Sequence, residues 1–108
     1  MAVNQQTLLK LQSLEQLYRK GYHSNTVDAA IDKLVGLEQS RVEQELTRLE
    51  ERTHALEVQY HLSSAEFYRL FRAGKMGDEA DYFEWSTFYQ MWLSTRERLD
   101  VLRLSVAA

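Results

Sequence analysis

Two long stripes of mostly apolar residues, spaced alternately by four and three positions, constrain the fold of this chain most. The members of the first stripe are Val42, Leu46, Leu49, Thr53, Leu56 and Tyr60, and those of the second are Trp85, Phe88, Trp92, Thr95, Leu99 and Leu102. This spacing is typical of the a/d seam of a coiled-coil-like helix. Proline is absent from the sequence, which suits long uninterrupted helices. We therefore expect an all-α protein, an elongated antiparallel helical hairpin or small bundle with coiled-coil-like heptad seams.

Glycines and short polar residues indicate where the N-terminal helices begin and end. Leucines at helical spacing predict a first helix over residues 5–20, which Gly21 stops. Asn25, followed by Asp28, resembles the N-cap of a second helix. Stepping the first seam backward through Gly36 suggests that this helix continues into the heptad region. We expect one helical domain over residues 1–108, with N-terminal helices up to residue 36 and a hairpin with an aromatic core over 37–108.

A short helix is expected between the two seams. Residues 63–66, Ser-Ser-Ala-Glu, form a capping box, in which the hydroxyl of Ser63 accepts from the Glu66 amide and Glu66 reaches back. The helix should end near residue 73, with Gly74 as its C-cap. Asp78 is then a candidate N-cap for a last helix over about residues 79–104.

Composition excludes several classes of protein. Without cysteine the chain has neither disulfides nor thiolate metal sites. Its net charge of −3 argues against direct nucleic-acid binding, which needs a basic face. No apolar run approaches the roughly 20 residues of a membrane span, and the first residues lack the pattern of a signal peptide. We expect a cytoplasmic protein that makes no membrane contact and holds no cofactor.

Catalytic or metal-binding patterns are weak. Arg48 and His54 have a spacing similar to that of helical ribonucleases of the HEPN class, in which His acts as acid or base and Arg stabilises the phosphate. However, apolar Leu49 follows the arginine, where those enzymes usually have a polar residue. His54 and His61 are seven apart, which is too far for the i, i+4 metal pair of a helix. We therefore predict a protein that is not an enzyme and binds no metal, with a HEPN-like ribonuclease as the weakest alternative.

Aromatic residues concentrate in one part of the chain. Nine of the twelve lie between Phe67 and Trp92, so this segment should dominate either a core or an interface. Both interpretations stay open at this point. The candidate partner-binding residues are Tyr82, Trp85, Tyr89 and Arg96. Trp85 belongs to the seam, which favours the core, whereas the other three are spaced by seven on another strip and suit docking.

The first seam helix carries an acidic surface. Residues 37–58 contain six Glu and three Arg, a difference that equals the net charge of the whole chain. Such a face either keeps the helix solvated, with local Glu–Arg pairs, or attracts a basic partner. The sequence leaves both possibilities open.

Three strings in the aromatic segment resemble those of a family of small bacterial helical proteins. They are Ser-Ala-Glu-Phe-Tyr at 64–68, Ala-Gly-Lys-Met-Gly-Asp at 73–78, and Asp-Tyr-Phe-Glu-Trp at 81–85. Such proteins are similar to the antitoxin half of toxin–antitoxin pairs, with a small TumE-like toxin as neighbour. The resemblance covers about residues 46–102 and implies a non-enzymatic antitoxin that neutralises a small toxin protein by occlusion. The alternative is a coiled-coil structural or adaptor subunit, and in either case we expect a homo-oligomer such as a dimer.

Overall fold

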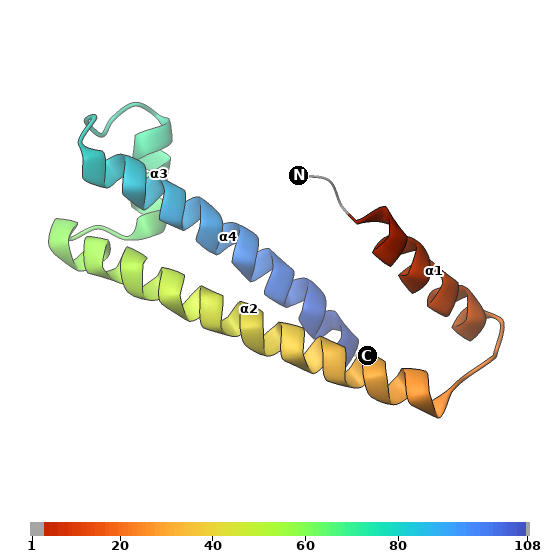
Figure 1. The fold of residues 1–108 in the computed structure, drawn as a ribbon. Helices are drawn as coiled ribbons and strands as arrows, with labels where there is room; N and C mark the ends of the chain where they lie inside the picture. Colours follow the sequence, from red (N-terminus) through yellow and green to blue (C-terminus); the bar gives the residue numbers. More distant parts are fainter. Residues whose placement is uncertain (1–3, 108) are drawn as a thin grey trace. The chain divides into compact units, whose positions relative to one another are not determined.

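The computed structural model describes the backbone of residues 4–107 and the side chains of residues 4–104 (Figure 1). These residues form four helices and no strand, which confirms the all-α prediction. The helices are α1 (Gln5–Arg19), α2 (Asn25–Tyr60), α3 (Ser64–Arg72) and α4 (Ala80–Ala107). The chain divides into two compact units, one ending at Leu34 and the other beginning at Val35, two residues before the boundary that the sequence suggested. Residues 1–3 and 108 of the expected domain lie outside the described residues.

The first unit comprises α1 and the beginning of α2. Asn4 caps α1 by accepting the Thr7 amide at 3.2 Å. At its other end Gly21 has φ +93°, and the amides of Gly21 and Tyr22 bond the carbonyls of Tyr18 and Leu17. This is the Schellman arrangement, in which glycine adopts the left-handed conformation at little cost. Gly21 therefore ends the helix as predicted.

The start of α2 differs from the expectation. The hydroxyl of Ser24 accepts the Val27 amide at 3.3 Å and the Ser24 carbonyl accepts the Asp28 amide at 2.9 Å, so Ser24 caps the helix and Asn25 is its first residue. Serine and asparagine are almost equally good caps, and local sequence does not separate two adjacent candidates. From here α2 continues through Gly36 to Tyr60, as the extended seam predicted.

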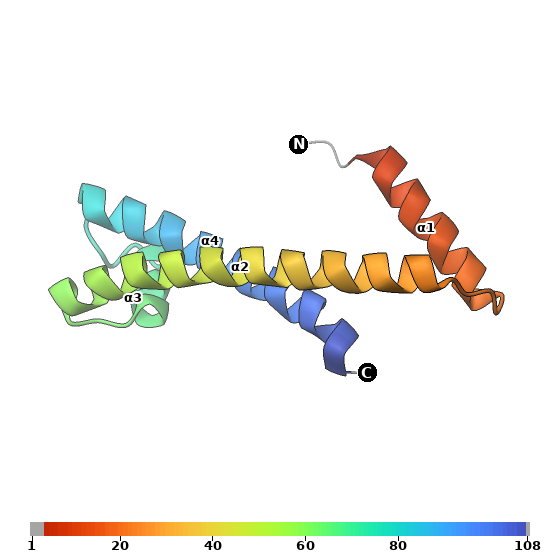
Figure 2. The same ribbon diagram turned by 60° about the horizontal axis from the view of Figure 1, so that its bottom comes forward.

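In the second unit, α2 and α4 form an antiparallel hairpin with α3 at its closed end (Figures 1 and 2). In Figure 2, α4 crosses α2 obliquely. The side-chain amide of Gln39 donates to the Leu102 carbonyl at 3.0 Å, and the indole of Trp92 donates to Glu50 at 3.2 Å. Within this unit, Gln39 thus pairs with the later part of α4 and Glu50 with a residue about three turns earlier on α4, which sets the antiparallel register.

Both predicted seams face this interface. The described residues of the first seam that are buried are Val42, Leu46, Leu49 and Thr53. Those of the second are Trp85, Thr95 and Leu99. Val42, Leu46 and Leu99 form one core cluster, against which Trp92 and Leu102 pack. Burial of these apolar side chains, worth about 25 cal/mol per Å², holds the hairpin together.

Helix α3 has the ends that the sequence predicted. The Ser63 hydroxyl accepts the Glu66 amide at 3.2 Å, which confirms that half of the capping box. The Glu66 carboxylate instead binds Arg69, whose guanidinium lowers the pKa of Glu66. Gly74 has φ +72° and follows the C-cap Ala73 in a second Schellman arrangement. Helix α4 begins at Ala80, one residue later than expected.

Candidate partner-binding groove

A layer of stacked aromatic rings fixes α3 against the hairpin. Trp85 lies almost parallel to Phe67, with ring centroids 3.9 Å apart, and stacks on Tyr60 at 5.8 Å. Its indole N–H donates to the Ser64 hydroxyl at 2.8 Å. Trp85 and Phe67 are both 0% exposed. Trp85 is therefore a core residue, and its place among the candidate docking residues is corrected, because in this fold no part of its ring reaches the surface.

The other three candidates lie in different surroundings along α4. Tyr82 is half-buried, with its ring 5.4 Å from that of Tyr60, so it extends the aromatic core. Tyr89 is half-buried farther along α4. Arg96 is exposed and lies 3.5 Å from Asp100 one turn later on the same helix. Their spacing by seven places them along one helix, but α3 covers only part of it, so their surroundings differ.

A groove of about 580 Å³ lies where α2, the start of α3 and α4 meet. One face of α2 supplies Thr47, Glu50, Glu51, His54 and Glu57. The N-terminal end of α3 contributes residues 63–65, and Tyr89 and Trp92 project from α4. The rings of Tyr89 and Trp92 are nearly parallel, with centroids 5.9 Å apart, and both are half-buried. The groove thus has an aromatic wall opposite an acidic one.

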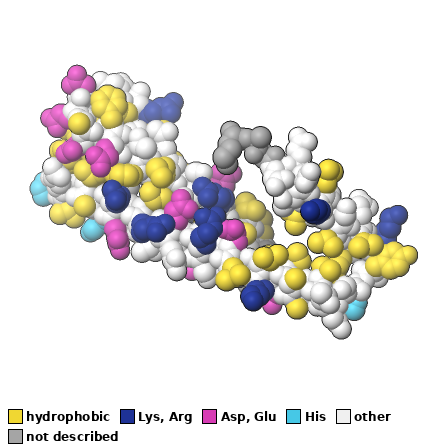
Figure 3. Space-filling view, viewed as in Figure 1, with side chains coloured by type: hydrophobic (Ala, Val, Ile, Leu, Met, Phe, Trp, Pro, Cys, Tyr) yellow, Lys and Arg dark blue, Asp and Glu magenta, His cyan; other side chains and the backbone are white. Residues whose placement is uncertain are grey.

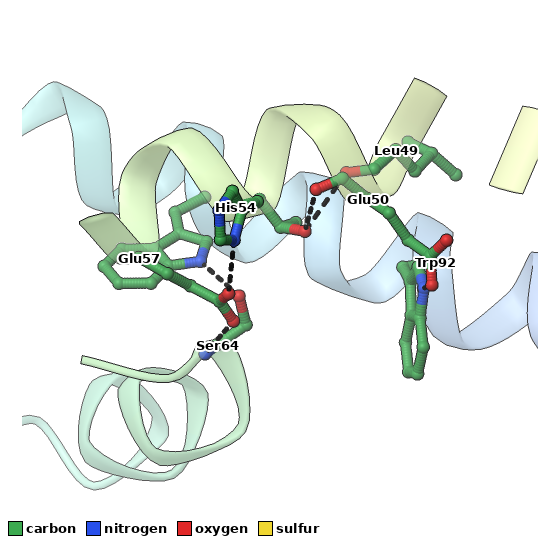
Figure 4. Close-up of polar contacts among 8 residues, drawn as sticks. Leu49, Glu50, His54, Glu57, Ser64 and Trp92 are labelled. Atoms are coloured by element: carbon green, nitrogen blue, oxygen red, sulfur yellow. Dashed lines mark hydrogen bonds and ion pairs between the residues drawn. The ribbon is translucent and has the colours of Figure 1, made fainter. Parts of the chain in front are cut away.

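Hydrogen bonds hold two of the three groove carboxylates in place (Figure 4). Glu57 points toward α3, where its Oε2 accepts the Ser64 amide at 2.7 Å and its Oε1 lies 3.7 Å from Nδ1 of His54. Glu50 points toward α4 and accepts the indole N–H of Trp92 at 3.2 Å. The carboxylate of Glu51 has no hydrogen bond or ion pair with any residue in the described part of the chain.

The charge of the groove is uncompensated. Among the described residues, its lining includes three Glu and neither Lys nor Arg. Elsewhere on α2, Glu38 pairs with Arg41 and Glu45 with Arg98, both outside the groove. On the face shown in Figure 3, basic and acidic side chains lie side by side over the middle of the hairpin. The groove therefore combines negative charge with an aromatic surface, and no Lys or Arg side chain among its lining residues neutralises that charge.

A hydrogen bond also joins the end of α2 to the start of α4. The hydroxyl of Tyr60, the last residue of α2, donates to Oδ2 of Asp81 in the first turn of α4 at 2.6 Å. This hydrogen bond, with a smaller contribution from burial, raises the pKa of Tyr60 to about 12. The contact keeps the ring that stacks on Trp85 in place.

The residues considered for ribonuclease chemistry do not share one site. His54 lines the groove, whereas Arg48 lines a separate hollow with Ser40 and Glu43. His54 is paired with Glu57 rather than with the arginine. Among residues 4–107 there is no group of three or more His, Cys, Asp or Glu placed to hold a metal ion. Within the same residues, no helix combines the length and the apolar character that crossing a membrane requires.

Of the groove residues, only Tyr89 was among the docking candidates of the sequence. Trp92 belongs to the second seam and packs against the core cluster, but it is only half-buried and also lines the groove. The acidic face of α2 was recognised, but nothing in the sequence singled out Glu50, Glu51 and Glu57. Their i, i+1, i+7 spacing indicates one broad helix face, and only the position of α3 turns that face into a groove.

Comparison with known proteins gave no relative: the sequence matches no family model, no curated protein and no solved structure.

Proposed function

We propose that this chain is a non-enzymatic protein-binding protein, the antitoxin of a toxin–antitoxin pair, which neutralises a small toxin by covering its functional surface. The observation that carries the proposal is the groove at the junction of α2, α3 and α4, with its aromatic wall and its carboxylates that lack a Lys or Arg partner. Such a surface fits a basic partner, and basic surfaces are what RNA-directed proteins use to bind phosphates.

The physics of association supports this use of the groove. Uncompensated negative charge steers a basic partner toward the site and raises the rate of encounter. Half-buried Tyr and Trp side chains then supply the contact energy, because these residue types are enriched among interface hot spots. Tyr89 and Trp92 line the groove and are positioned for this role, whereas Trp85 is buried and packs α4 against α3.

The residues that resemble the antitoxin family build the element that forms one side of the groove. Phe67 and Trp85 provide the buried stack that holds α3, and Gly74 allows the turn that follows it. The motif is thus a structural one in this fold. The motif supports the proposal because it positions α3, on which the shape of the partner-binding groove depends.

The proposal is tested by co-expression with the neighbouring open reading frame. Each gene is expressed alone and together, growth is followed, and a tag on this chain is used to purify any complex. We expect the neighbour to arrest growth alone and to be harmless, and co-purified, when this chain is present. A harmless neighbour that does not bind would contradict the antitoxin function.

A structural or adaptor subunit that self-associates is the second candidate, and the first unit favours it. Helix α1 has no buried residue, and its side chains Leu8, Leu11 and Leu17 are each close to half exposed. Exposed leucines on one helix suit association with another copy. Light scattering of the pure protein tests this candidate: a monomer argues against it, whereas a stable oligomer supports it only when the neighbouring gene is also harmless and its product does not bind.

A further inference from the structure

We propose that the groove is a socket for an arginine side chain of the partner, which lies along the aromatic wall and binds the carboxylates of Glu50 and Glu51. This inference deepens the proposed function, on which it rests for the nature of the partner. It assigns to the groove a ligand chemistry, a guanidinium group, that can be tested without the partner.

The geometry of the two walls carries the argument. Glu50 and Trp92 are joined by a hydrogen bond of 3.2 Å, so the carboxylate is held at the edge of the indole ring. Glu51 lines the same groove, and its carboxylate has no hydrogen bond or ion pair with any described residue. A cation in the groove would therefore meet a fixed carboxylate, a free carboxylate and an aromatic surface together.

The remaining titratable groups of the groove leave this end unneutralised. Among the described lining residues, none is Lys or Arg, and the Nδ1 of His54 faces Glu57 at 3.7 Å. Glu57 is also bound by the Ser64 amide at the N-terminal end of α3. Glu50 and Glu51 are thus the groove carboxylates without a cationic neighbour. A partner that complements their charge must place a cationic group beside them.

Arginine fits this arrangement better than lysine. Its flat guanidinium stacks on aromatic rings and can bond carboxylates through two parallel N–H groups, whereas the lysine ammonium is a compact, strongly hydrated point charge. The chain already uses such contacts, since the guanidinium of Arg52 lies 5.2 Å from the ring centre of Phe88 and that of Arg72 lies 5.8 Å from that of Tyr68. Stacking on Trp is the strongest of these cation–π contacts.

The two tryptophans allow a direct test by NMR, because the chain has no others. The indole N–H of Trp92 lies at the groove, and that of Trp85 is buried against Ser64. The ¹⁵N-labelled full chain is titrated with a short acetylated, amidated peptide that contains one arginine, and with matched lysine and citrulline peptides. Citrulline has nearly the shape of arginine but no charge. Loss of one resonance in Trp92→Phe assigns the two indole signals.

We expect a saturable shift of the Trp92 indole signal with the arginine peptide, weaker binding of the lysine peptide, and no binding of the citrulline peptide. Replacing Glu50 and Glu51 together by Gln should weaken arginine binding at least tenfold. Glu43→Gln is the matched control, because Glu43 is an exposed residue of α2 outside the groove, and it should leave binding unchanged.

Two results would overturn the socket: equal binding of the citrulline peptide, or arginine binding that survives in the Glu50→Gln, Glu51→Gln protein. A harmless neighbouring gene combined with arginine binding at Trp92 would instead refute the toxin while leaving the socket intact. A toxin complex whose formation is unaffected by the double substitution would support the antitoxin function and refute the socket. The two failures are therefore distinguishable.

Discussion

The indole of Trp85 and the phenyl ring of Phe67 lie 3.9 Å apart with an interplanar angle of 4°, and both side chains are fully buried. This contact joins α4 to α3, and Ser64 adds a hydrogen bond to the same indole. Since α3 supplies one side of the groove, the Trp85–Phe67 pair connects the core of the hairpin to the proposed function.

Removing the partner of the Trp85 indole should destabilise the protein. In Ser64→Ala the buried N–H of Trp85 loses its acceptor, so we expect the free energy of unfolding to fall by about 1–3 kcal/mol. Chemical denaturation followed by circular dichroism measures this. Ser40→Ala, at an exposed position of α2, is the control and should change stability by less than about 0.5 kcal/mol. Equal effects of the two substitutions would refute the assignment.

The opposite effect is expected at Thr95. Its hydroxyl is buried and has no hydrogen-bond partner among the described residues, a state that costs about 1–3 kcal/mol. Thr95→Val keeps the shape and removes the unsatisfied group, so it should raise the midpoint of thermal unfolding. Thr53→Val is the matched comparison, because the Thr53 hydroxyl lies 3.1 Å from the Leu49 carbonyl, and it should give no gain. A loss of stability in Thr95→Val would show that the hydroxyl is satisfied.

Backbone strain at the end of α2 predicts a stabilising glycine. His61 has φ +54°, a conformation that costs an L-residue about 1–2 kcal/mol and costs glycine little. His61→Gly should therefore stabilise the protein by roughly 0.5–1 kcal/mol after the greater freedom of unfolded glycine is counted. The reciprocal change, Gly74→Ala at φ +72°, should destabilise it through backbone strain alone, since a Cβ there would meet no atom within 4 Å. Urea denaturation of both variants tests the pair, and a destabilised His61→Gly protein would contradict it.

The Tyr60–Asp81 contact predicts a loss of stability at high pH. The pKa of Tyr60 rises from 10.0 to about 12 because its hydroxyl donates to Asp81, so the folded protein holds this proton when the unfolded chain releases it. The stabilisation is complete below pH 10 and is lost as the pH rises from 10 to 12. In Tyr60→Phe, the fall in unfolding free energy over this range should be shallower than in the wild type. Identical slopes would show that the contact does not persist in solution.

Much of the fold follows from local sequence. The alternating spacing of four and three predicted the buried faces of both long helices, because a straight helix brings such residues to one side. Gly21 and Gly74 marked helix ends through their left-handed backbones, and Ser63 marked the start of α3 through its cap. These signals are readable because each depends on only a few neighbouring residues.

The remaining features depend on contacts between distant segments. No glycine marks the end of α2 after Tyr60. His61 takes the left-handed backbone conformation there, because the surrounding structure overrides the local preference of a non-glycine residue. The groove was also missed, because Glu50 and Trp92 are 42 residues apart and meet only through the register of the hairpin. Trp92 and Leu99 belong to the same seam, and spacing alone does not show that Leu99 is fully buried whereas Trp92 also lines the groove.

The claim that the partner binds at the groove is tested most directly by calorimetry. The affinity for the protein encoded by the neighbouring gene is measured for the Tyr89→Ala and Arg96→Ala variants and compared with that of the wild type. Tyr89 lines the groove, and Arg96 is an exposed residue of the same helix outside it. With helicity unchanged by circular dichroism, we expect calorimetry to show a loss of about 2 kcal/mol for Tyr89→Ala, roughly thirtyfold in affinity, and little change for Arg96→Ala. Undiminished binding of the Tyr89→Ala protein would show that the partner does not bind at the groove.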